Sequence, residues 1–378
     1  MSDALSQFQA FLILNALPDV GPVTTNRLLA EFAGDPCRIL SAGGERLQEV
    51  RGVGEVISRS IVSWKEVFDL EKEEARMAAS GVGFLTTSDV LYPPLLKEIH
   101  DPPIGLYRKG NPVTDRPCVA IVGSRRTTAY GQTVAAKLGA DLARAGFCVV
   151  SGLARGIDTA AHEGALCAGG QTAAILGHGM DTVYPPENLA LYRRIEREGV
   201  ILTEFPFTRR ADRQSFAMRN RIVAGMSVAL IVVESDVNGG SMITAKFAGD
   251  QGRLVFAVPG RIDQPTSAGC HQLIRDGATL LTSVDDLLSE LSYLDGLRPA
   301  AVMPNASRHA VPSAPEEVSP EEQRLLSCFA GGAILSIDAL CDSSGLALPE
   351  VSAGLMQLEL RRRVVKRVDG TFEARAVL

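Results

Sequence analysis

A short segment near the middle of the chain combines one aromatic ring with several cations. Between Phe205 and Gly225 the sequence carries five arginines and a single acid, Asp212, a local charge of +4 in a chain whose formal net charge is −6. Phe216 stands in this polar, basic stretch rather than in an apolar stripe. An aromatic ring flanked by guanidinium groups can stack on a base while the cations hold phosphates. The segment therefore offers stacking and phosphate binding; a solvated loop, or a Phe216 that caps the core, is the plainer alternative.

Glycine and hydroxyl residues that suit phosphate occur in further segments. Gly123-Ser124-Arg125-Arg126 ends one apolar run, and Gly239-Gly240-Ser241 opens a helical pattern that continues through Thr244. Backbone N–H groups at a glycine turn or a helix start bind anions, and guanidinium groups add paired planar donors. Ser151–Asp158 and Gly177–Asp181 also follow apolar runs. Each segment alone could equally be a tight turn, but together they predict an edge of the fold that holds phosphate.

The usual groups of enzyme chemistry are missing from these segments. The glycines lack the Gly-x-Gly-x-x-Gly spacing of dinucleotide sites, and Lys246 falls at the wrong spacing for a Walker loop. His178 has no partner at short spacing, and there is neither a Ser/His/Asp order nor a close carboxylate pair. The seven cysteines are scattered without a Cys-x-x-Cys pair, which argues against a zinc site and a disulfide framework. We predict no catalytic residue, no metal and no cofactor.

The elements that would position these segments follow an alternating pattern from about residue 80 to 295. Short runs rich in Val and Ile, typical of parallel strands buried on both faces, alternate with helical segments. This repetition predicts an α/β fold with an extended Rossmann-like, doubly wound, mostly parallel sheet. Ligands bind such sheets at the carboxyl ends of the strands, where the glycine segments lie. The predicted strands are Cys118–Val122, Phe147–Val150, Thr172–Leu176, Val200–Thr203, Val228–Val233, Leu254–Val258 and Ala278–Leu281.

The pattern changes on either side of this region and predicts four parts. Residues 1–78 indicate short helices with two glycine hairpins, as in helix-hairpin-helix or SAM-like domains, although the hairpins could equally be turns of a small bundle. Residues 79–295 form the Rossmann-like domain, and residues 296–320 have the Pro, Ala and Ser composition of a linker. Residues 321–378 resemble a small winged helix whose last helix ends in Arg361-Arg362-Arg363. DNA and protein both remain open as partners of that part.

Composition narrows the class of protein further. No apolar run approaches the ~20 residues that cross a bilayer. The start, Met1-Ser2-Asp3-Ala4, lacks the basic region of a signal peptide, so we expect a cytoplasmic protein without a membrane partner. The net charge of −6 argues against a protein that binds nucleic acid over its whole surface. Contact with DNA would then be confined to one groove.

Five motifs occur in an order that resembles the DNA-processing protein A family of bacteria (DprA, also called Smf). The resemblance covers roughly residues 85–290, and the helical N-terminal region and the winged-helix-like tail fit the longer members. The motifs are Gly123-Ser124-Arg125, Ser151-Gly152-x-Ala154-x-Gly156-Ile157-Asp158, Gly177-x-Gly179-x-Asp181-x-x-Tyr184-Pro185, Arg219-Asn220-Arg221-Ile222-x-Ala224-Gly225 and Gly240-Ser241-x-Ile243-Thr244-Ala245.

The resemblance implies a homodimer that binds single-stranded DNA without catalysis. Such proteins protect incoming DNA during natural transformation and load the RecA recombinase onto it. Carried over by motif, Ser124 and Arg125 would hold phosphate and Phe216 would contact a base. The residues implied for the same groove are Arg213, Arg219, Asn220, Arg221, Gly240, Ser241 and Thr244.

One motif departs from the family pattern. The usual Gly-Thr-Asn before Leu-Ile reads Gly269-Cys270-His271 here, which puts any polar role of that loop in doubt. Two rival functions remain open beside DNA binding. A Rossmann-like nucleotide phosphoribohydrolase would need a catalytic glutamate after its glycine loop, where this chain has Ala245-Lys246. A scaffold that recruits the recombinase without touching DNA is the other.

Overall fold

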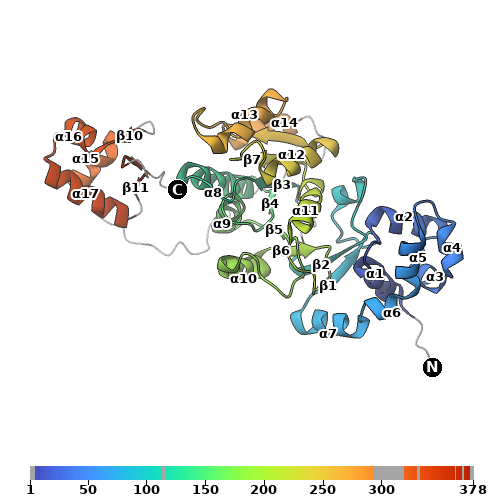
Figure 1. The fold of residues 1–378 in the computed structure, drawn as a ribbon. Coiled ribbons are helices and arrows are strands. Elements are labelled where there is room, and N and C mark those ends of the chain that lie inside the picture. The colour runs from blue at the N-terminus through green and yellow to red at the C-terminus, as the bar shows by residue number, and fades with distance from the viewer. Residues whose placement is uncertain are drawn as a thin grey trace. The chain divides into compact units, whose positions relative to one another are not determined.

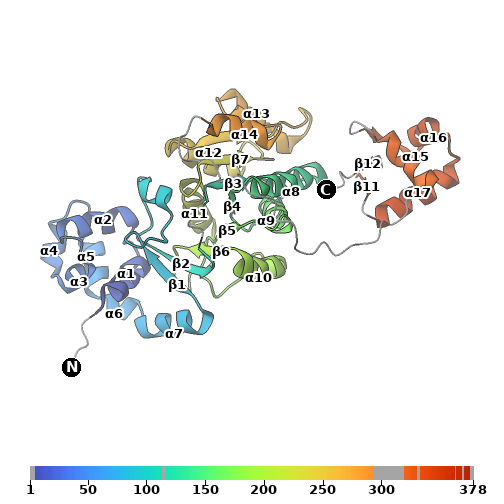
Figure 2. The ribbon, with the colours of Figure 1, turned by 180° about the vertical axis from the view of Figure 1, so that it is seen from behind.

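The computed structural model describes residues 5–112, 116–292, 319–329, 333–361, 363–367 and 370–374. The chain divides into two compact units, Met1–Val302 and Met303–Leu378. Figure 1 shows their elements, and Figure 2 shows them from behind.

The first unit begins with a group of short helices. Ser6 starts the first of them with a capping box, in which its hydroxyl accepts from Gln9 N at 3.2 Å and the Gln9 amide oxygen accepts from Ser6 N at 3.0 Å. Residues Ala10–Leu14 are all buried, so this helix is central to the group. The helices are α1 (Gln7–Ala16), α2 (Pro22–Glu31), α3 (Pro36–Ser41), α4 (Gly44–Gln48), α5 (Glu55–Val62), α6 (Trp64–Val67) and α7 (Leu70–Ser80).

A nine-stranded sheet follows in the same unit, with the order β1-β2-β6-β5-β4-β3-β7-β8-β9. The seven strands β6, β5, β4, β3, β7, β8 and β9 are parallel to one another. Strand β2 pairs antiparallel with both β1 and β6. The strands are β1 (Gly83–Thr86), β2 (Gly105–Gly110), β3 (Cys118–Val122), β4 (Cys148–Ser151), β5 (Thr172–Ile175), β6 (Val200–Thr203), β7 (Ala229–Val232), β8 (Leu254–Ala257) and β9 (Thr279–Leu280).

Helices cover both faces of the sheet, as the continuous apolar strands require. One apolar cluster packs α8, α9 and α14 against one face, and another packs α11, α12 and α13 against the other (Figures 1 and 2). The mostly parallel, doubly wound Rossmann-like fold predicted from the sequence is therefore present. The helices are α8 (Ala129–Arg144), α9 (Ile157–Cys167), α10 (Leu189–Glu198), α11 (Arg213–Gly225), α12 (Gly240–Asp250), α13 (Ala268–Arg275) and α14 (Val284–Leu291); short 3-10 turns lie at Pro94–Glu98, Pro186–Asn188 and Pro265–Ser267.

The sheet has a topological switch point beside β3. The chain runs from β3 through β4 and β5 to β6 in one direction, and from β7 through β8 to β9 in the other. Crossover connections on the two sides of such a point leave a crevice at the carboxyl ends of the adjacent strands, and ligands bind there. The crevice of this sheet is at the ends of β3 and β7.

The N-terminal helices are joined to the sheet by polar contacts. Glu73 of α7 is 3% exposed, and its carboxylate accepts from the hydroxyl of Tyr107 at 2.8 Å and from Phe207 N at 3.0 Å. Asn15 of α1 donates through its side-chain amide to the carbonyl oxygen of Glu204 at 2.7 Å. Both contacts reach the segment between β6 and α11, so the helices hold that segment in place.

The second unit is a small winged helix. The helices among its described residues enclose an apolar core that includes Leu325, Leu340 and Leu355. The elements are α15 (Pro320–Cys328), β10 (Ile334–Leu335), α16 (Ile337–Ser344), α17 (Leu348–Leu360), β11 (Val364–Lys366) and β12 (Phe372–Ala374), and the strand order is β10-β12-β11. The predicted linker, residues 296–320, lies outside the described residues except for Ser319 and Pro320.

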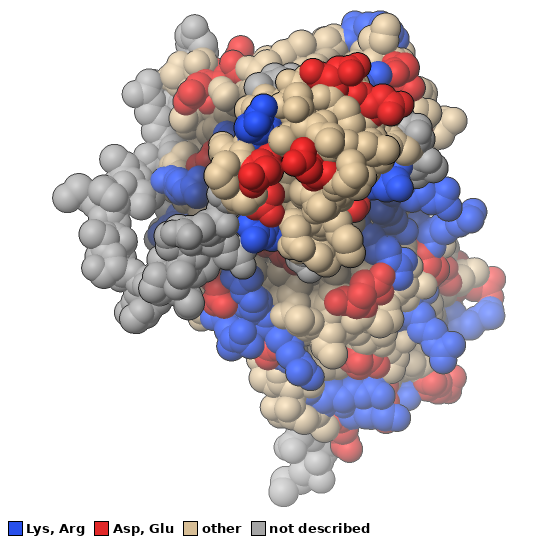
Figure 3. Space-filling view, turned by 90° about the vertical axis from the view of Figure 1, so that its left-hand side faces the viewer, with Lys and Arg blue, Asp and Glu red and all other residues tan. Residues whose placement is uncertain are grey.

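The surface carries charges of both signs. Basic and acidic side chains are interspersed on the face drawn in Figure 3, in keeping with 38 basic and 44 acidic residues in the whole chain. Over the described residues, no helix is both long and apolar enough to cross a membrane.

Candidate functional site

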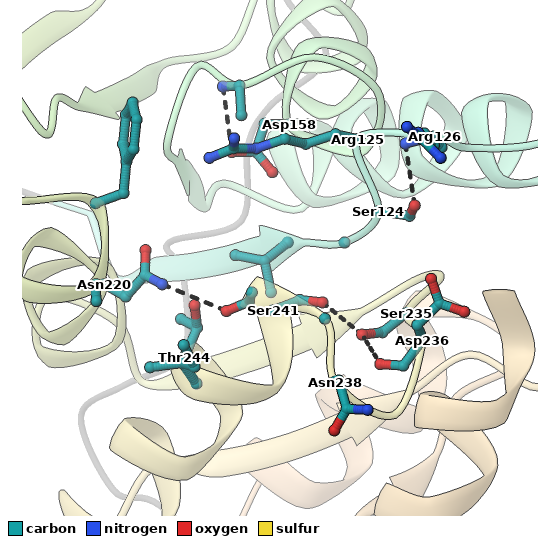
Figure 4. Close-up of a pocket in the computed structure, with 18 of the residues that line it drawn as sticks. Ser124, Arg125, Arg126, Asp158, Asn220, Ser235, Asp236, Asn238, Ser241 and Thr244 are labelled. Atoms are coloured by element: carbon teal, nitrogen blue, oxygen red, sulfur yellow. Dashed lines mark hydrogen bonds between the residues drawn. The ribbon is translucent and has the colours of Figure 1, made fainter. Parts of the chain in front are cut away.

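A cavity of about 620 Å³ opens at the carboxyl ends of β3 and β7, the switch point of the sheet. The loops after β3, β4 and β7 form its walls together with one face of α11. In Figure 4, Arg125 and Asp158 lie along one side, and Asn220, Ser241 and Thr244 lie along the other. Nine of the ten residues selected from the sequence line it: Ser124, Arg125, Arg213, Phe216, Arg219, Asn220, Gly240, Ser241 and Thr244.

The basic segment forms the helix α11. The Asp212 carboxylate accepts from Ser215 N at 2.7 Å, and the Ser215 hydroxyl accepts from Asp212 N at 3.1 Å, so this pair caps the first turn. The hydrogen bond from Ser215 N lowers the pKa of the Asp212 carboxyl. The one acid of the segment therefore has a structural role. Cavity-lining residues recur along α11 with the spacing of a single helix face, at Arg213, Phe216, Ala217 and Asn220.

The Phe216 ring lies close to two cations. The guanidinium carbon of Arg125 is 5.0 Å from the centre of the Phe216 ring, and that of Arg219 is 6.0 Å from it. The ring is half-buried and lies outside the apolar clusters that the described residues form on the two faces of the sheet. Phe216 is thus a wall of the cavity and not a part of the core, which removes one of the plainer readings of the segment.

Arg219 is a buried cation at the base of the cavity. It is 3% exposed, and a Cβ at Gly152 would lie 1.5 Å from its Nη1, so only glycine leaves room for it. Burial lowers the pKa of Arg219 to about 10, while the nearby carboxylate of Asp158 opposes that shift. Among the described residues, no group forms a hydrogen bond with its Nε. A buried, incompletely paired guanidinium is suited to an anion that enters the cavity.

Asp158 balances Arg219 from the start of α9. Its carboxylate accepts from Gly152 N at 3.1 Å and from Ala154 N at 3.3 Å. Burial raises the pKa of Asp158, and Arg219 opposes the rise. A second acid, Asp236, is exposed and also lines the cavity. These two acids were not among the residues selected from the sequence. Their signal in the sequence is their position in segments that follow predicted strands.

The loop after β3 is held by a buried carboxylate. Glu234, 2% exposed at the end of β7, accepts from the hydroxyl groups of Thr127 and Thr128, both at 2.6 Å, and from Thr128 N at 2.9 Å. Gly156 has a φ of 81°, and a Cβ there would lie 2.3 Å from the carbonyl oxygen of Ser124. The loop is thus fixed from two neighbouring strands, and Arg125 extends from a rigid base.

The loop after β7 leads into α12 without a side-chain cap. The Ser241 hydroxyl donates to the Ser235 hydroxyl at 2.7 Å, and the Asn220 amide donates to the carbonyl oxygen of Gly240 at 3.4 Å. The first turn of α12 therefore joins α11 at the cavity. The N–H groups of a helix start and the positive end of its dipole attract negative charge, which is the chemistry expected of this loop.

Arg221 is the one selected residue that does not line the cavity. It is 3% exposed; its Nε is 3.1 Å from Asp101 Oδ2, and its Nη2 pairs with the Glu204 carboxylate. Burial raises the pKa of Glu204, and Arg221 opposes the rise. Our expectation that Arg221 lines the groove beside Arg219 and Asn220 is corrected, because its two ion pairs hold the guanidinium against Asp101 and Glu204 instead.

Two other polar groups considered in the sequence are involved in local packing. Cys270 is buried, and its thiol donates to the carbonyl oxygens of Val232 at 3.6 Å and Val233 at 3.5 Å. Burial raises the pKa of this thiol to about 12. His178 is 1% exposed, and its Nδ1 contacts the Gly179 carbonyl oxygen at 2.8 Å. Within the described ranges, no three His, Cys, Asp or Glu side chains group closely enough to hold a metal ion.

Comparisons with known proteins agree with this architecture. Residues 83–292 match the family model of DNA recombination-mediator protein A, and residues 309–370 match the DprA winged helix domain. Protein Smf of Synechocystis is 33% identical, and the match covers 94% of this chain and 96% of that protein.

Two solved structures are also similar. An X-ray structure of DNA processing protein A from Streptococcus pneumoniae matches 76% of this chain and 99% of its own, with a TM-score of 0.65 and 32% identity. A structure of DNA processing protein A from Helicobacter pylori, described for its single-stranded DNA binding mode, matches 56% of this chain and 96% of its own, with a TM-score of 0.51 and 29% identity. The chain therefore belongs to the DNA-processing protein A family, DprA/Smf.

Proposed function

We propose that this protein binds single-stranded DNA in the cavity at the ends of β3 and β7. The observation that carries the proposal is the position of the Phe216 ring within 5.0 Å of the Arg125 guanidinium carbon and 6.0 Å of that of Arg219. A half-buried ring beside two cations can stack on a base of any sequence while the cations hold the adjoining phosphates. The glycine and hydroxyl loops that contain Ser124 and Ser241 supply further donors for phosphate.

The similarity to the Helicobacter pylori protein supports the same ligand. That protein is described by its single-stranded DNA binding mode, and its match with this chain covers 56% of the residues here. By the family resemblance, we propose that this protein acts as a homodimer. It would protect incoming single strands and load the RecA recombinase onto them.

We further propose that the site binds DNA without catalysis. The buried acid of the cavity, Asp158, already accepts two backbone hydrogen bonds and faces Arg219, so its carboxylate has a structural task. The alternative hypothesis is a nucleotide phosphoribohydrolase. It predicts that nucleoside monophosphates release a free base when they are incubated with the protein. We expect no release, and base release at a rate proportional to protein concentration would support the hydrolase.

The test of DNA binding is a double variant, Arg213→Glu with Phe216→Ala. Loss of the ring, and a reversed charge at the mouth of the cavity, should weaken the binding of an oligo-dT strand on the order of a hundredfold. The matched control, Arg144→Glu with Phe8→Ala, changes one exposed arginine and one exposed ring that do not line the cavity. Unchanged affinity of the first variant would contradict DNA binding here and favour a scaffold without DNA contact.

A further inference from the structure

A second aromatic ring extends the wall formed by Phe216. The ring centres of Tyr184 and Phe216 are 5.6 Å apart, and the ring planes are inclined by 39°. Tyr184 lies in the segment between β5 and α10, and it is half-buried like Phe216. The end of β5 packs directly on α11, because a Cβ at Gly177 would lie 2.8 Å from Cδ1 of Phe216. The two rings therefore form one continuous surface that passes beyond the cavity.

The second ring has a cation of its own. The guanidinium carbon of Arg155 is 6.0 Å from the centre of the Tyr184 ring. Arg155 follows β4 in the sequence, just as Arg125 follows β3 and reaches Phe216 at 5.0 Å. Since β3, β4 and β5 are neighbours in the sheet, the pair of a cation and a ring repeats along its carboxyl edge.

Arg155 is available to a ligand. Its side chain is 49% exposed, and it pairs with the carboxylate of Glu187, which is 53% exposed. An ion pair between two such exposed side chains is weak and is screened by salt. A phosphate can therefore replace Glu187 as the partner of Arg155 without leaving a buried charge behind.

The Tyr184 ring is held in its orientation by a neighbouring ring. The His178 ring packs edge-on against it, with ring centres 6.5 Å apart and planes at 82°. His178 itself is fixed, since its Nδ1 is 2.8 Å from the carbonyl oxygen of Gly179. Tyr184 is not a member of the apolar clusters that the described residues form. A half-buried ring that packs against a fixed neighbour is preorganised for stacking.

We propose that Tyr184 and Arg155 form a second nucleotide subsite, in which Tyr184 stacks on the base next to the one at Phe216 and Arg155 binds its phosphate. This inference rests on the proposed function of the cavity and adds a direction to it. The strand runs from the first turn of α12 past the ends of β3 and β4 toward the segment after β5.

The first test compares the affinities of single-residue variants for oligo-dT. Tyr184→Leu should weaken binding about tenfold, because one stacked base is lost, whereas Tyr184→Phe should bind like the natural protein. Arg155→Gln should lower the slope of log affinity against log salt by about 0.7, the value for one phosphate contact on a single strand. Arg144→Gln is the matched control, since it removes an exposed arginine that pairs with Asp141 at 2.8 Å outside the cavity.

The second test places a fluorescent reporter in the subsite and does not depend on a loss of binding. Trp64 is the one tryptophan of the chain, so a Trp64→Phe, Tyr184→Trp protein emits from the subsite alone. Oligo-dT should quench this emission, and an oligonucleotide with one abasic position at the matching place should quench it less. Absence of quenching at saturating oligo-dT would overturn the subsite even if Tyr184→Leu proved unstable.

The outcomes separate this inference from the function on which it rests. If Phe216→Ala weakens binding while Tyr184→Leu and Arg155→Gln match the natural protein, the subsite is wrong and the cavity remains the DNA site. If Phe216→Ala also binds like the natural protein, the proposed function fails as well. Equal losses in Tyr184→Phe and Tyr184→Leu would show that the tyrosine hydroxyl is needed, which would contradict stacking as the role of the ring.

Discussion

The guanidinium carbon of Arg125 lies 5.0 Å from the centre of the Phe216 ring and so connects the loop after β3 with helix α11. Arg125 is exposed, whereas Arg219, 6.0 Å from the same ring, is buried. The two cations therefore differ in freedom. In the proposed function, the exposed cation would turn toward a phosphate and open the ring to a base, while the buried one would stay in place as a fixed charge.

Phosphate binding by Arg125 can be tested by two substitutions of this residue. Arg125→Gln should weaken oligo-dT binding about tenfold and reduce the salt slope by about 0.7, because one phosphate contact is lost. Arg125→Lys should keep the salt slope but lose part of the affinity, since lysine has no planar paired donors. Fluorescence anisotropy titrations at several salt concentrations measure both quantities. An unchanged slope in Arg125→Gln would remove Arg125 from the phosphate contacts.

The fixed role of Arg219 depends on the missing side chain of Gly152. Gly152→Ala places a Cβ 1.5 Å from the present position of Nη1, so Arg219 must move out of its site. We expect a lower melting temperature together with weaker oligo-dT binding. Gly249→Ala is the control, because a Cβ at this exposed position of α12 meets nothing within 4 Å. That change should stabilise the protein by about 0.5–1 kcal/mol and leave DNA affinity unchanged.

Arg221 should matter for stability and not for direct DNA contact. Removal of one partner from a buried ion pair leaves an uncompensated charge, so Arg221→Met should reduce the free energy of unfolding by about 3–5 kcal/mol. Arg221→Met with Glu204→Gln should lose less, because Glu204, the more buried of the two carboxylates that pair with Arg221, then carries no charge. Urea unfolding measures both variants. If the folded double variant lost oligo-dT affinity as strongly as Phe216→Ala does, our assignment of Arg221 to the interior would be incomplete.

His162 should make the stability of the protein depend on pH. The Thr172 hydroxyl donates to the carbonyl oxygen of Val149 at 2.6 Å, so its oxygen accepts from Nδ1 of His162, also at 2.6 Å. Nε2 then carries no proton and is buried without a partner among the described residues. Burial, with a smaller contribution from Arg219, lowers the pKa of His162 to about 3.

The direction of the pH effect follows from this lowered pKa. Between about pH 6.5 and pH 3 the unfolded chain binds a proton at this histidine and the folded protein does not. The contribution of the buried, neutral His162 to the free energy of unfolding is thus complete above pH 6.5 and is lost as the pH falls toward 3. We expect His162→Gln to reduce the slope of the unfolding free energy against pH in that window by up to about 1.4 kcal/mol per pH unit. Parallel curves for the two proteins would contradict the prediction.

Much of the sheet could be predicted from the sequence, because buried parallel strands have an unmistakable apolar pattern. The predicted strands Cys118–Val122 and Val200–Thr203 have the bounds of β3 and β6. The antiparallel strands β1 and β2 were not predicted. They are short, and β2 ends in Arg108-Lys109-Gly110, which weakens its apolar signal.

The site could be predicted as a set of residues but not as an arrangement. The glycine segments were expected at one edge because parallel strands end there together. The helical state of α11 was missed, since arginines cover its polar face and its cap is an Asp-x-x-Ser pattern without the usual Glu. Without that helix, the sequence could not separate the buried Arg219 and Arg221 from the exposed Arg213, nor show that Arg221 faces away from the cavity.

The buried Glu73 connects the N-terminal helices to the segments that support the cavity. A protein that lacks residues 1–78 would leave the Tyr107 hydroxyl and Phe207 N–H without the acceptor they share, directly upstream of α11. Weaker DNA binding by such a truncation would therefore report a disturbed scaffold as readily as a lost contact surface. Point variants on the exposed faces of α2 and α5, with Glu73 intact, are the experiment that can assign those helices a DNA contact of their own.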